Sequence, residues 1–362
     1  MQNIKKDKII GSLLGGAVGD ALGAAVEFSS SKEIHERFGS DGIRDYSSAY
    51  GRKGAITDDT QMCLFTAEGL MRANNRWFDR GLCHIPGAIH RAYLRWLLTQ
   101  GESPEYSDLC YDEADGALLY PGWLYALPEL HNRRAPGNSC LSSLKSGICG
   151  SVEKPINNSK GCGGVMRITP VGLTGMEDSR IFKLACDAAA ITHGHASGYL
   201  AAGVLAVVIS SITTGTSLEE AIFVGLSKTE GLHQREEVET AVLQAVTKAR
   251  NGTPSRQEIE LLGEGWVAEE ALAISLYCAL SADSFEEGVI LAVNHGGDSD
   301  STGAITGNIL GAIHGVSKIS DRWLTDLELR FEIEQVAKDI YKYFHTESYV
   351  PNDEDYERYP PN

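Results

Sequence analysis

The sequence of 362 residues has eight cysteines but no Cys-x-x-Cys pair. Three of the cysteines, Cys63, Cys186 and Cys278, fall within apolar patterns of helical period, where a free thiol behaves as a small hydrophobic side chain. Cysteines used in this way are typical of a reducing compartment and not of a disulfide-linked secreted protein. We therefore expect a cytoplasmic protein.

Positive charge is also scarce. The chain has 32 Lys and Arg against 49 Asp and Glu, which gives a formal net charge of -17 at pH 7. This balance argues against a nucleic-acid-binding surface, because such surfaces need clustered Lys and Arg. It also makes a phosphate-bearing substrate unfavourable unless metal ions screen the charge locally.

Strand and membrane signals are missing as well. No stretch of useful length alternates apolar and polar residues, and the chain has no hairpin signal, internal repeat, membrane-spanning run or convincing linker. Because 43% of the residues are apolar, the chain can form a large core. The sequence therefore predicts an all-α protein, with one domain over residues 1–350 and a loose, acidic, proline-containing tail over residues 351–362.

The N-terminal segment is apolar and follows three lysines, so it imitates a secretory signal. Asp20 and Glu27 interrupt that pattern, and the apolar residues keep a helical period from Ile9 to Val26. Glycines recur every fourth residue here and again late in the chain, at Gly11, Gly15, Gly19 and Gly23 and at Gly303, Gly307, Gly311 and Gly315. Because a glycine inside a helix costs about 1 kcal/mol relative to alanine, the two rows predict close backbone contact. Packing of one row on the other would bring Asp20 and Glu27 near Asp298.

Further segments carry helix signals. A loop is expected over residues 29–54, followed by a helix that begins at the Thr57 cluster. The other expected helices are Pro86–Thr99, a short helix around Leu141–Leu144, Ile181–Ala190, Ala196–Thr213, Leu218–Gly225, Glu236–Ala249, Val267–Ala282, Phe285–Val293, Ala304–His314 and Leu327–Tyr343. Within an aromatic, turn-rich run over residues 106–130, the sequence Tyr120-Pro121-Gly122-Trp123 is typical of a surface loop.

Two short acidic stretches stand directly before helical patterns. They are Thr57-Asp58-Asp59-Thr60 and Asp298-Ser299-Asp300-Ser301-Thr302, and each combines two carboxylates with hydroxyls. Such residues are preferred helix N-caps, and capping alone would account for either stretch. Hard cations also take these oxygen ligands, and bound ions would offset the repulsion between neighbouring carboxylates. Two clusters of matching composition therefore favour a binuclear metal centre.

Two other motifs carry weaker signals. The glycine-rich run over residues 161–167 would let backbone NH groups approach an anion, although no strand precedes it. His193 and His195 stand at the junction of two expected helices, where a histidine can cap a helix, pack, or contact a ligand. Because hydroxyls and carboxylates suit a hard ion, neither histidine is assigned to the metal.

Six motifs stand out along the chain: Gly19-Asp20-Ala21-Leu22-Gly23 with Glu27, Thr57-Asp58-Asp59-Thr60, Arg134-Ala135-Pro136-Gly137-Asn138, Gly164-Val165-Met166-Arg167-Ile168-Thr169-Pro170, Thr192-His193 and Gly297-Asp298-Ser299-Asp300-Ser301-Thr302-Gly303. Together these motifs resemble the ADP-ribosylglycohydrolase family, and in particular its dinitrogenase reductase-activating glycohydrolases and ADP-ribosylarginine hydrolases. They occur in the family's order over most of the chain. The resemblance implies a compact, orthogonal bundle of many helices. It also implies two Mg2+ or Mn2+ ions and hydrolysis of the glycosidic bond between ADP-ribose and its acceptor.

The resemblance assigns roles to individual residues. It places metal ligands at Thr57, Asp58, Asp59, Asp298, Asp300 and Ser301, and substrate-binding residues at Asn138, Gly163, Gly164, Met166 and His193. The general base would be Asp59 or Glu27, because each would lie beside the reacting water. Ser301 keeps the oxygen of the threonine that is frequent in the family. Cys162 replaces the asparagine that many members have in the ribose-phosphate pocket.

The implied substrate is a mono-ADP-ribosylated protein. We favour arginine as the acceptor because the resemblance implies it: the family's bacterial members commonly act there, and an acidic pocket would suit a guanidinium leaving group. Hydrolysis of this N-glycosidic bond would reverse the action of an ADP-ribosylating enzyme or toxin. Two alternatives use the same residues. A binuclear phosphohydrolase would release AMP, whereas an immunity-type protein would bind and occlude an ADP-ribosylating toxin. No nucleic-acid or membrane partner is expected.

Overall fold

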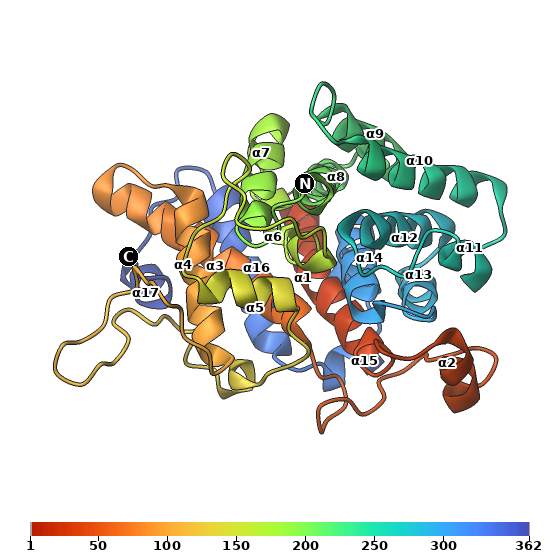
Figure 1. Ribbon diagram of the computed structural model, residues 1–362, viewed down its shortest axis with the longest axis horizontal. Helices are drawn as coiled ribbons and strands as arrows, with labels where there is room; N and C mark the ends of the chain where they lie inside the picture. The colour runs from red at the N-terminus through yellow and green to blue at the C-terminus, as the bar shows by residue number, and fades with distance from the viewer. Residues whose placement is uncertain (1, 362) are drawn as a thin grey trace.

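The structure is a computed structural model that describes residues 2–361. It confirms the all-α class, because these residues form seventeen α-helices, three short 3-10 helices and no strand (Figure 1). The α-helices are α1 (Gln2–Gly23), α2 (Ser31–Phe38), α3 (Asp58–Arg80), α4 (Ile85–Thr99), α5 (Asn138–Lys145), α6 (Thr169–Gly172), α7 (Asp178–Ala190), α8 (Ala196–Thr213), α9 (Leu218–Ser227), α10 (Glu236–Asn251), α11 (Arg256–Glu260), α12 (Ala268–Ser281), α13 (Phe285–Ala292), α14 (Ser299–His314), α15 (Asp321–Asp326), α16 (Arg330–His345) and α17 (Asp353–Arg358). The 3-10 helices are η1 (Pro128–His131), η2 (Cys162–Gly164) and η3 (Val316–Lys318).

The two glycine rows pack on each other, as predicted. A β-carbon added to Gly19 would lie 1.9 Å from the carbonyl oxygen of Gly303, and one added to Gly307 would lie 2.0 Å from that of Gly15. Only glycine allows two helix backbones to approach this closely. Helices α1 and α14 therefore lie side by side in opposite directions through the middle of the molecule (Figure 1). The end of α1 is thereby placed against the start of α14.

A reciprocal pair of hydrogen bonds holds this crossing in register. The Ser12 hydroxyl donates to the backbone oxygen of Asn308 at 2.9 Å, and the Asn308 amide donates back to the Ser12 carbonyl at 2.8 Å. Both side chains are buried, so each bond also satisfies a polar group that would otherwise lose its solvent partner.

Helix α8 shows why an apolar helix need not be a membrane span. It is the one helix among residues 2–361 that is long and apolar enough to cross a bilayer, and 94% of it is buried inside the protein. An evenly apolar helix of this kind fits the centre of a large core. It packs between α7 and α9, and touches α6, α12 and α14.

The expectation of a loose C-terminal tail is wrong over residues 351–361. Asn352 caps α17, and Tyr359 directly after the helix is fully buried, with its hydroxyl donating to Asp339 at 2.7 Å. The Asn75 amide of α3 donates to the backbone oxygens of Asp355 and Tyr359 at 3.1 and 2.7 Å. Acidic, proline-containing composition does not reveal these long-range bonds, so the segment resembles a disordered tail when only its sequence is considered.

The expected loop over residues 29–54 contains α2. Ser30 accepts a hydrogen bond from the Glu33 backbone while the Glu33 carboxylate accepts one from Ser30, which forms a capping box. Tyr120 is exposed as predicted for a surface loop, but the neighbouring Trp123 is half-buried and packs edge-on against Tyr359. The turn-rich run therefore folds back onto the C-terminal segment.

Candidate functional site

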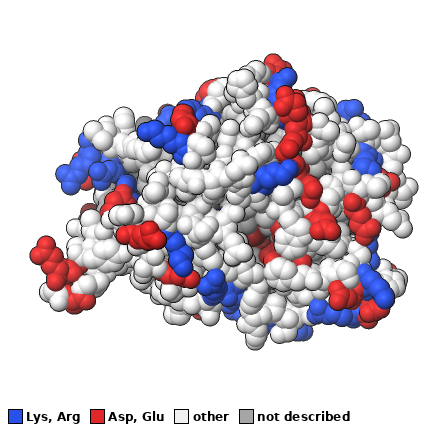
Figure 2. Space-filling model, in the orientation of Figure 1, with Lys and Arg blue, Asp and Glu red and all other residues white. Residues whose placement is uncertain are grey.

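The predicted site residues meet in a hollow of about 220 Å³, which we call the acidic hollow. The start of α3, the start of α14, the glycine-rich loop before α6 and the loop before α5 form its wall. Of the predicted residues, Glu27, Asp58, Asp59, Asn138, Gly163, Met166, His193, Asp298, Asp300 and Ser301 line it. Figure 2 shows a hollow near the middle of this face, with acidic side chains inside it and along its right-hand rim.

Two predicted residues do not line the acidic hollow. Gly164 lies behind the glycine-rich loop, where a β-carbon would be 3.0 Å from that of Ala189 and 3.2 Å from the Gly198 carbonyl oxygen. Its role is close packing against α7 and α8, contrary to the expected contact with substrate. Thr57 is fully buried and caps α3, with its hydroxyl oxygen accepting a hydrogen bond from the Asp59 backbone at 3.3 Å.

Asp20 of α1 holds the first acidic cluster in place. Both of its carboxylate oxygens lie 3.0 Å from the Thr57 backbone nitrogen, and it also accepts from the Thr60 backbone at 3.2 Å and from the Thr60 hydroxyl. A carboxylate is well placed here, since the first turn of a helix has free NH groups. The predicted approach of Asp20 to the site is confirmed, and its contacts make it a positioning residue.

The second acidic cluster depends on close backbone contact. Asp298 caps α14 by accepting from the Ser301 backbone at 3.4 Å, and its own NH donates to the Glu264 carbonyl oxygen at 2.8 Å. Gly297, with φ +151°, fits only because it has no side chain: a β-carbon would lie 2.1 Å from that same Glu264 oxygen. Capping is thus confirmed for Thr57 and Asp298. The Asp300 carboxylate accepts a hydrogen bond from the Ser301 backbone NH at 3.0 Å.

Burial and mutual repulsion strongly favour the protonated carboxyls in the acidic hollow. Burial first, and then the charges of Asp300 and Asp298, raise the pKa of Glu27 to about 11. Burial and the charge of Asp300 raise the pKa values of Asp58 and Asp59 well above their usual range. No Lys or Arg lines the acidic hollow within the part of the chain that the structure describes. Among the described residues, the lining therefore offers no Lys or Arg charge to offset these groups.

The donor set fits hard divalent cations. Glu27 Oε2 and Asp59 Oδ2 are buried oxygens without a hydrogen-bond partner, and the Ser301 hydroxyl lies beside them in the hollow wall. Carboxylate and hydroxyl oxygens are the ligands that Mg2+ and Mn2+ prefer. Among residues 2–361, no three His, Cys, Asp or Glu side chains already converge on one point. Closure around an ion would thus require side-chain rotation and the hydroxyl ligands.

Cys162 contacts the second acidic cluster directly. Its thiol donates to Asp298 Oδ2 at 2.8 Å, and the Ser301 hydroxyl donates to its sulfur at 3.6 Å. Burial, followed by the charges of Asp298 and Asp59, raises the pKa of the thiol well above its usual range, so it remains a protonated donor. The thiol thereby takes one of the oxygens that a metal ion would use.

The two histidines have different roles. His193 lies at the floor of the acidic hollow, under Gly163, with Nδ1 2.8 Å from the Thr192 hydroxyl. Burial and the neighbouring Arg167 lower the pKa of His193 to about 3, so the ring is neutral and can contact substrate. His195 caps α8 instead, by accepting from the Ser197 backbone at 3.1 Å.

Trp266 lines the acidic hollow, although its sequence motif did not indicate a site residue. It also lines a second, larger hollow, and its backbone oxygen accepts from the Cys162 backbone at 3.1 Å. It follows Gly263 and Gly265, both with positive φ. The short Gly-x-Gly turn is a signal for a shaped loop, but nothing near it indicates contact with residues over a hundred positions away.

We expect the protein to become less stable as pH rises when a chelator keeps it free of metal ions. Asp20 has a folded-state pKa raised to about 7 by burial and by Asp300, whereas an unfolded aspartate titrates near 4. Between these values the folded state holds a proton that the unfolded state has lost, so stability falls with increasing pH. Excess Mg2+ or Mn2+ should reverse the loss, by about 2.7 kcal/mol at a free-ion concentration one hundred times Kd. Thermal unfolding at pH 5 and pH 8, with chelator and with cation, tests this. A melting temperature indifferent to both variables would contradict it.

Comparison with known proteins identifies the class. The family model described as ADP-ribosylglycohydrolase matches residues 1–349. The chain is 26% identical to ADP-ribosyl-(dinitrogen reductase) glycohydrolase of Rhodospirillum rubrum over 337 residues, which cover 91% of this chain and 92% of that protein. It is 23% identical to an ADP-ribosylarginine hydrolase of Serratia proteamaculans over 340 residues, which cover 92% of this chain and 79% of that protein. A solved structure of an ADP-ribosylglycohydrolase-related protein complex superimposes with a TM-score of 0.67 at 26% identity, covering 94% of this chain and 99% of that one.

Fold, site and relatives together define a helical hydrolase that removes ADP-ribose from modified substrates. The chain belongs to the ADP-ribosylglycohydrolase family. The resemblance seen in the sequence motifs is therefore confirmed, as is the all-α fold that it implied.

Proposed function

We propose that the protein uses two divalent cations to hydrolyse the N-glycosidic bond of ADP-ribosylarginine in modified proteins. The observation that carries this proposal is the acidic hollow itself: buried carboxylates from two helix starts, with two unpartnered oxygens and no Lys or Arg among the described residues of the wall. Such a site is unfavourable unless cations occupy it. Family membership supplies the reaction class.

The residues that would hold the ions are Thr57, Asp58, Asp59, Asp298, Asp300 and Ser301. Bound Mg2+ or Mn2+ would supply the positive charge that fixes sugar hydroxyls and lowers the pKa of water. Thr57 would contribute only if its hydroxyl turned from its capping bond toward the hollow. Asp20 of α1 accepts from the Thr57 and Thr60 backbones, so the crossing of α1 on α14 holds the start of α3 near the start of α14.

The chain's own groups can carry out the proton transfers. Water attacks the anomeric carbon of the distal ribose, a new carbon–oxygen bond forms, and the bond to the arginine nitrogen breaks. With cations in the acidic hollow, Asp59 and Glu27 would be ionised, and the buried, unpartnered oxygen of either one could take the proton of this water and pass it to the departing guanidine. The remainder of ADP-ribose would bind against four other lining residues, Asn138, Gly163, Met166 and His193.

Arginine is the proposed acceptor for two reasons. The Serratia relative is, by its name, an ADP-ribosylarginine hydrolase, and the Rhodospirillum relative acts, by its name, on ADP-ribosylated dinitrogen reductase. In addition, a guanidinium leaving group is stabilised by neighbouring carboxylates, of which this site has many.

All eight cysteines are free, which supports a cytoplasmic location for such an enzyme.

The test is incubation with mono-ADP-ribosylated proteins that carry ADP-ribose on arginine or on serine, and with ADP-ribosylated nucleotides. We expect release of intact ADP-ribose from the arginine-linked substrate, and loss of that release with chelator. Release of AMP would instead indicate a phosphohydrolase. If the protein neutralised an ADP-ribosylating toxin equally well with metal-ligand variants, it would act by occlusion and the hydrolytic proposal would be wrong.

A further inference from the structure

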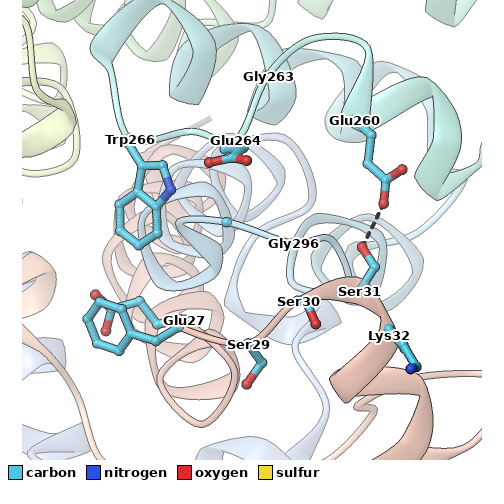
Figure 3. Close-up of a pocket in the computed structure, with 12 residues that line it drawn as sticks. Glu27, Ser29, Ser30, Ser31, Lys32, Glu260, Gly263, Glu264, Trp266 and Gly296 are labelled. Atoms are coloured by element: carbon cyan, nitrogen blue, oxygen red, sulfur yellow. Dashed lines mark hydrogen bonds between the residues drawn. The ribbon is translucent and has the colours of Figure 1, made fainter.

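A second hollow of about 620 Å³ opens beside the acidic hollow, and we call it the outer hollow. It lies between the segment that leads into α2 and the loop between α11 and α12 (Figure 3). Glu27 and Trp266 line both hollows and form the boundary between them. A group bound in the outer hollow would therefore lie next to the reacting atoms, on the side of Glu27.

The wall of the outer hollow is acidic. Glu27, Glu260 and Glu264 line it, and Lys32 is the only Lys or Arg among its described lining residues. Lys32 is 85% exposed and lies 3.7 Å from the Glu36 carboxylate, which offsets its charge. Glu27 is 6% exposed, and its Oε2 has no hydrogen-bond partner. This balance favours a cation and repels a phosphate.

Two aromatic rings stand at the same boundary. Phe28 and Trp266 are stacked, with ring centroids 5.9 Å apart and planes inclined by 13°. Phe28 is 73% exposed, although it directly follows the buried Glu27. Stacked aromatic faces beside carboxylates form a favourable environment for a planar guanidinium, through cation–π contact and ion pairing.

The loop that carries Glu264 and Trp266 is fixed by backbone bonds. Glu270 accepts from the backbones of Glu264 and Gly265 at 3.0 and 3.2 Å, the Glu264 carbonyl oxygen accepts from Asp298, and that of Trp266 accepts from Cys162. These bonds tie the outer hollow to both walls of the acidic hollow. The two sites therefore keep a constant separation, as needed for two parts of one substrate.

We propose that the outer hollow binds a basic segment of the acceptor protein, with an Arg or Lys side chain near the modified residue stacked on Phe28 and Trp266 and paired with Glu264. This inference rests on the proposed function, because only a substrate cleaved in the acidic hollow would place its leaving group, and the residues next to that group, on the Glu27 side. An adenine base is the competing occupant of two stacked rings. It is disfavoured because its attached diphosphate would lie beside the exposed carboxylates of Glu260 and Glu264.

The test is direct binding of an unmodified peptide with two arginines, compared with the same peptide carrying citrulline in their place. Intrinsic tryptophan fluorescence, to which Trp266 contributes, and calorimetry report the binding without any turnover. We expect the arginine peptide to bind more tightly than the citrulline peptide. Phe28→Ala and Glu264→Gln should each raise its Kd about twofold to fivefold. Both side chains are exposed, so these variants should fold normally.

Glu113→Gln is the matched control, since Glu113 is an exposed carboxylate in a distant loop and its loss should leave peptide binding unchanged. Any of three results would overturn the subsite. These are equal affinity for the arginine and citrulline peptides, wild-type affinity in both Phe28→Ala and Glu264→Gln, and displacement of the peptide by adenosine. If peptide binding depends on Phe28 and Glu264 but no ADP-ribose is released from any acceptor, the subsite stands and the proposed reaction fails. If ADP-ribose is released but peptide binding does not depend on Phe28 and Glu264, the proposed reaction stands and the subsite fails.

Discussion

Replacing Asp59 by alanine is expected to lower single-turnover release of ADP-ribose by about 10²–10⁴-fold, the range typical of a lost acid–base group. Asp59 stands in the first turn of α3 and lines the acidic hollow with an oxygen that no protein group satisfies. Its removal should change folding only modestly, because it also removes one of several carboxylates that repel each other. Rapid-quench measurement of ADP-ribose, together with thermal unfolding, separates the two effects.

The Glu27→Ala variant should behave differently. Glu27 lies at the boundary of the two hollows and outside the two acidic clusters, so its loss should slow turnover while bound metal remains. Glu113→Ala serves as the control for loss of one carboxylate elsewhere. Near-normal turnover by the Asp59 variant would refute the proposed catalytic centre. Loss of metal from the Glu27 variant would make Glu27 a ligand or the support of one.

Gly307→Leu is expected to destabilise the fold by about 3 kcal/mol or more, at the upper end of the usual cost of overpacking. Even a β-carbon at this position would lie 2.0 Å from the Gly15 carbonyl oxygen, which belongs to a helix backbone and cannot rotate away. The helices must then separate along their crossing. Since α1 positions Asp20 and α14 positions Asp298, catalysis should be lost along with stability.

Gly137→Ala is the matched control for this substitution. Gly137 has φ −59°, and a β-carbon there would meet no atom within 4 Å. Thermal unfolding should therefore show little change for Gly137→Ala and a large decrease for Gly307→Leu. An unchanged melting temperature for Gly307→Leu would mean that the two glycine rows do not pack as described.

The core of this site could be predicted from sequence because its signals are local. Four-residue spacing of glycines predicts a helix contact wherever two such rows occur, and the rows at Gly11 and Gly303 were enough to place Asp20 near Asp298. Likewise, carboxylates and hydroxyls before an apolar helical pattern mark a helix start whatever its tertiary environment. The fold class followed from helical periods and the lack of strand signals, and the meeting of the two acidic clusters followed from their matching composition.

What the sequence could not predict depends on long-range contacts. Tyr359 is buried because Asp339 and Asn75 bind the C-terminal segment, and no residue near Tyr359 indicates those partners. Gly164 resembled a substrate contact because its neighbours line the hollow, but a β-carbon there would point at α7 and α8. Trp266 reaches the site through a loop whose position is set by Asp298 and Cys162.

Titration of metal-free protein with Mn2+ or Mg2+, on wild type and on Asp300→Ala, is the most direct test of the central claim. Asp300 lies among the carboxylates at the start of α14 and raises the pKa of Glu27, Asp58 and Asp59 through its charge. Calorimetry should show two ions per chain in the wild type, and fewer or weaker sites in the variant. Stoichiometry and affinity that are both unaffected by Asp300→Ala would contradict a cation site built from the two acidic clusters.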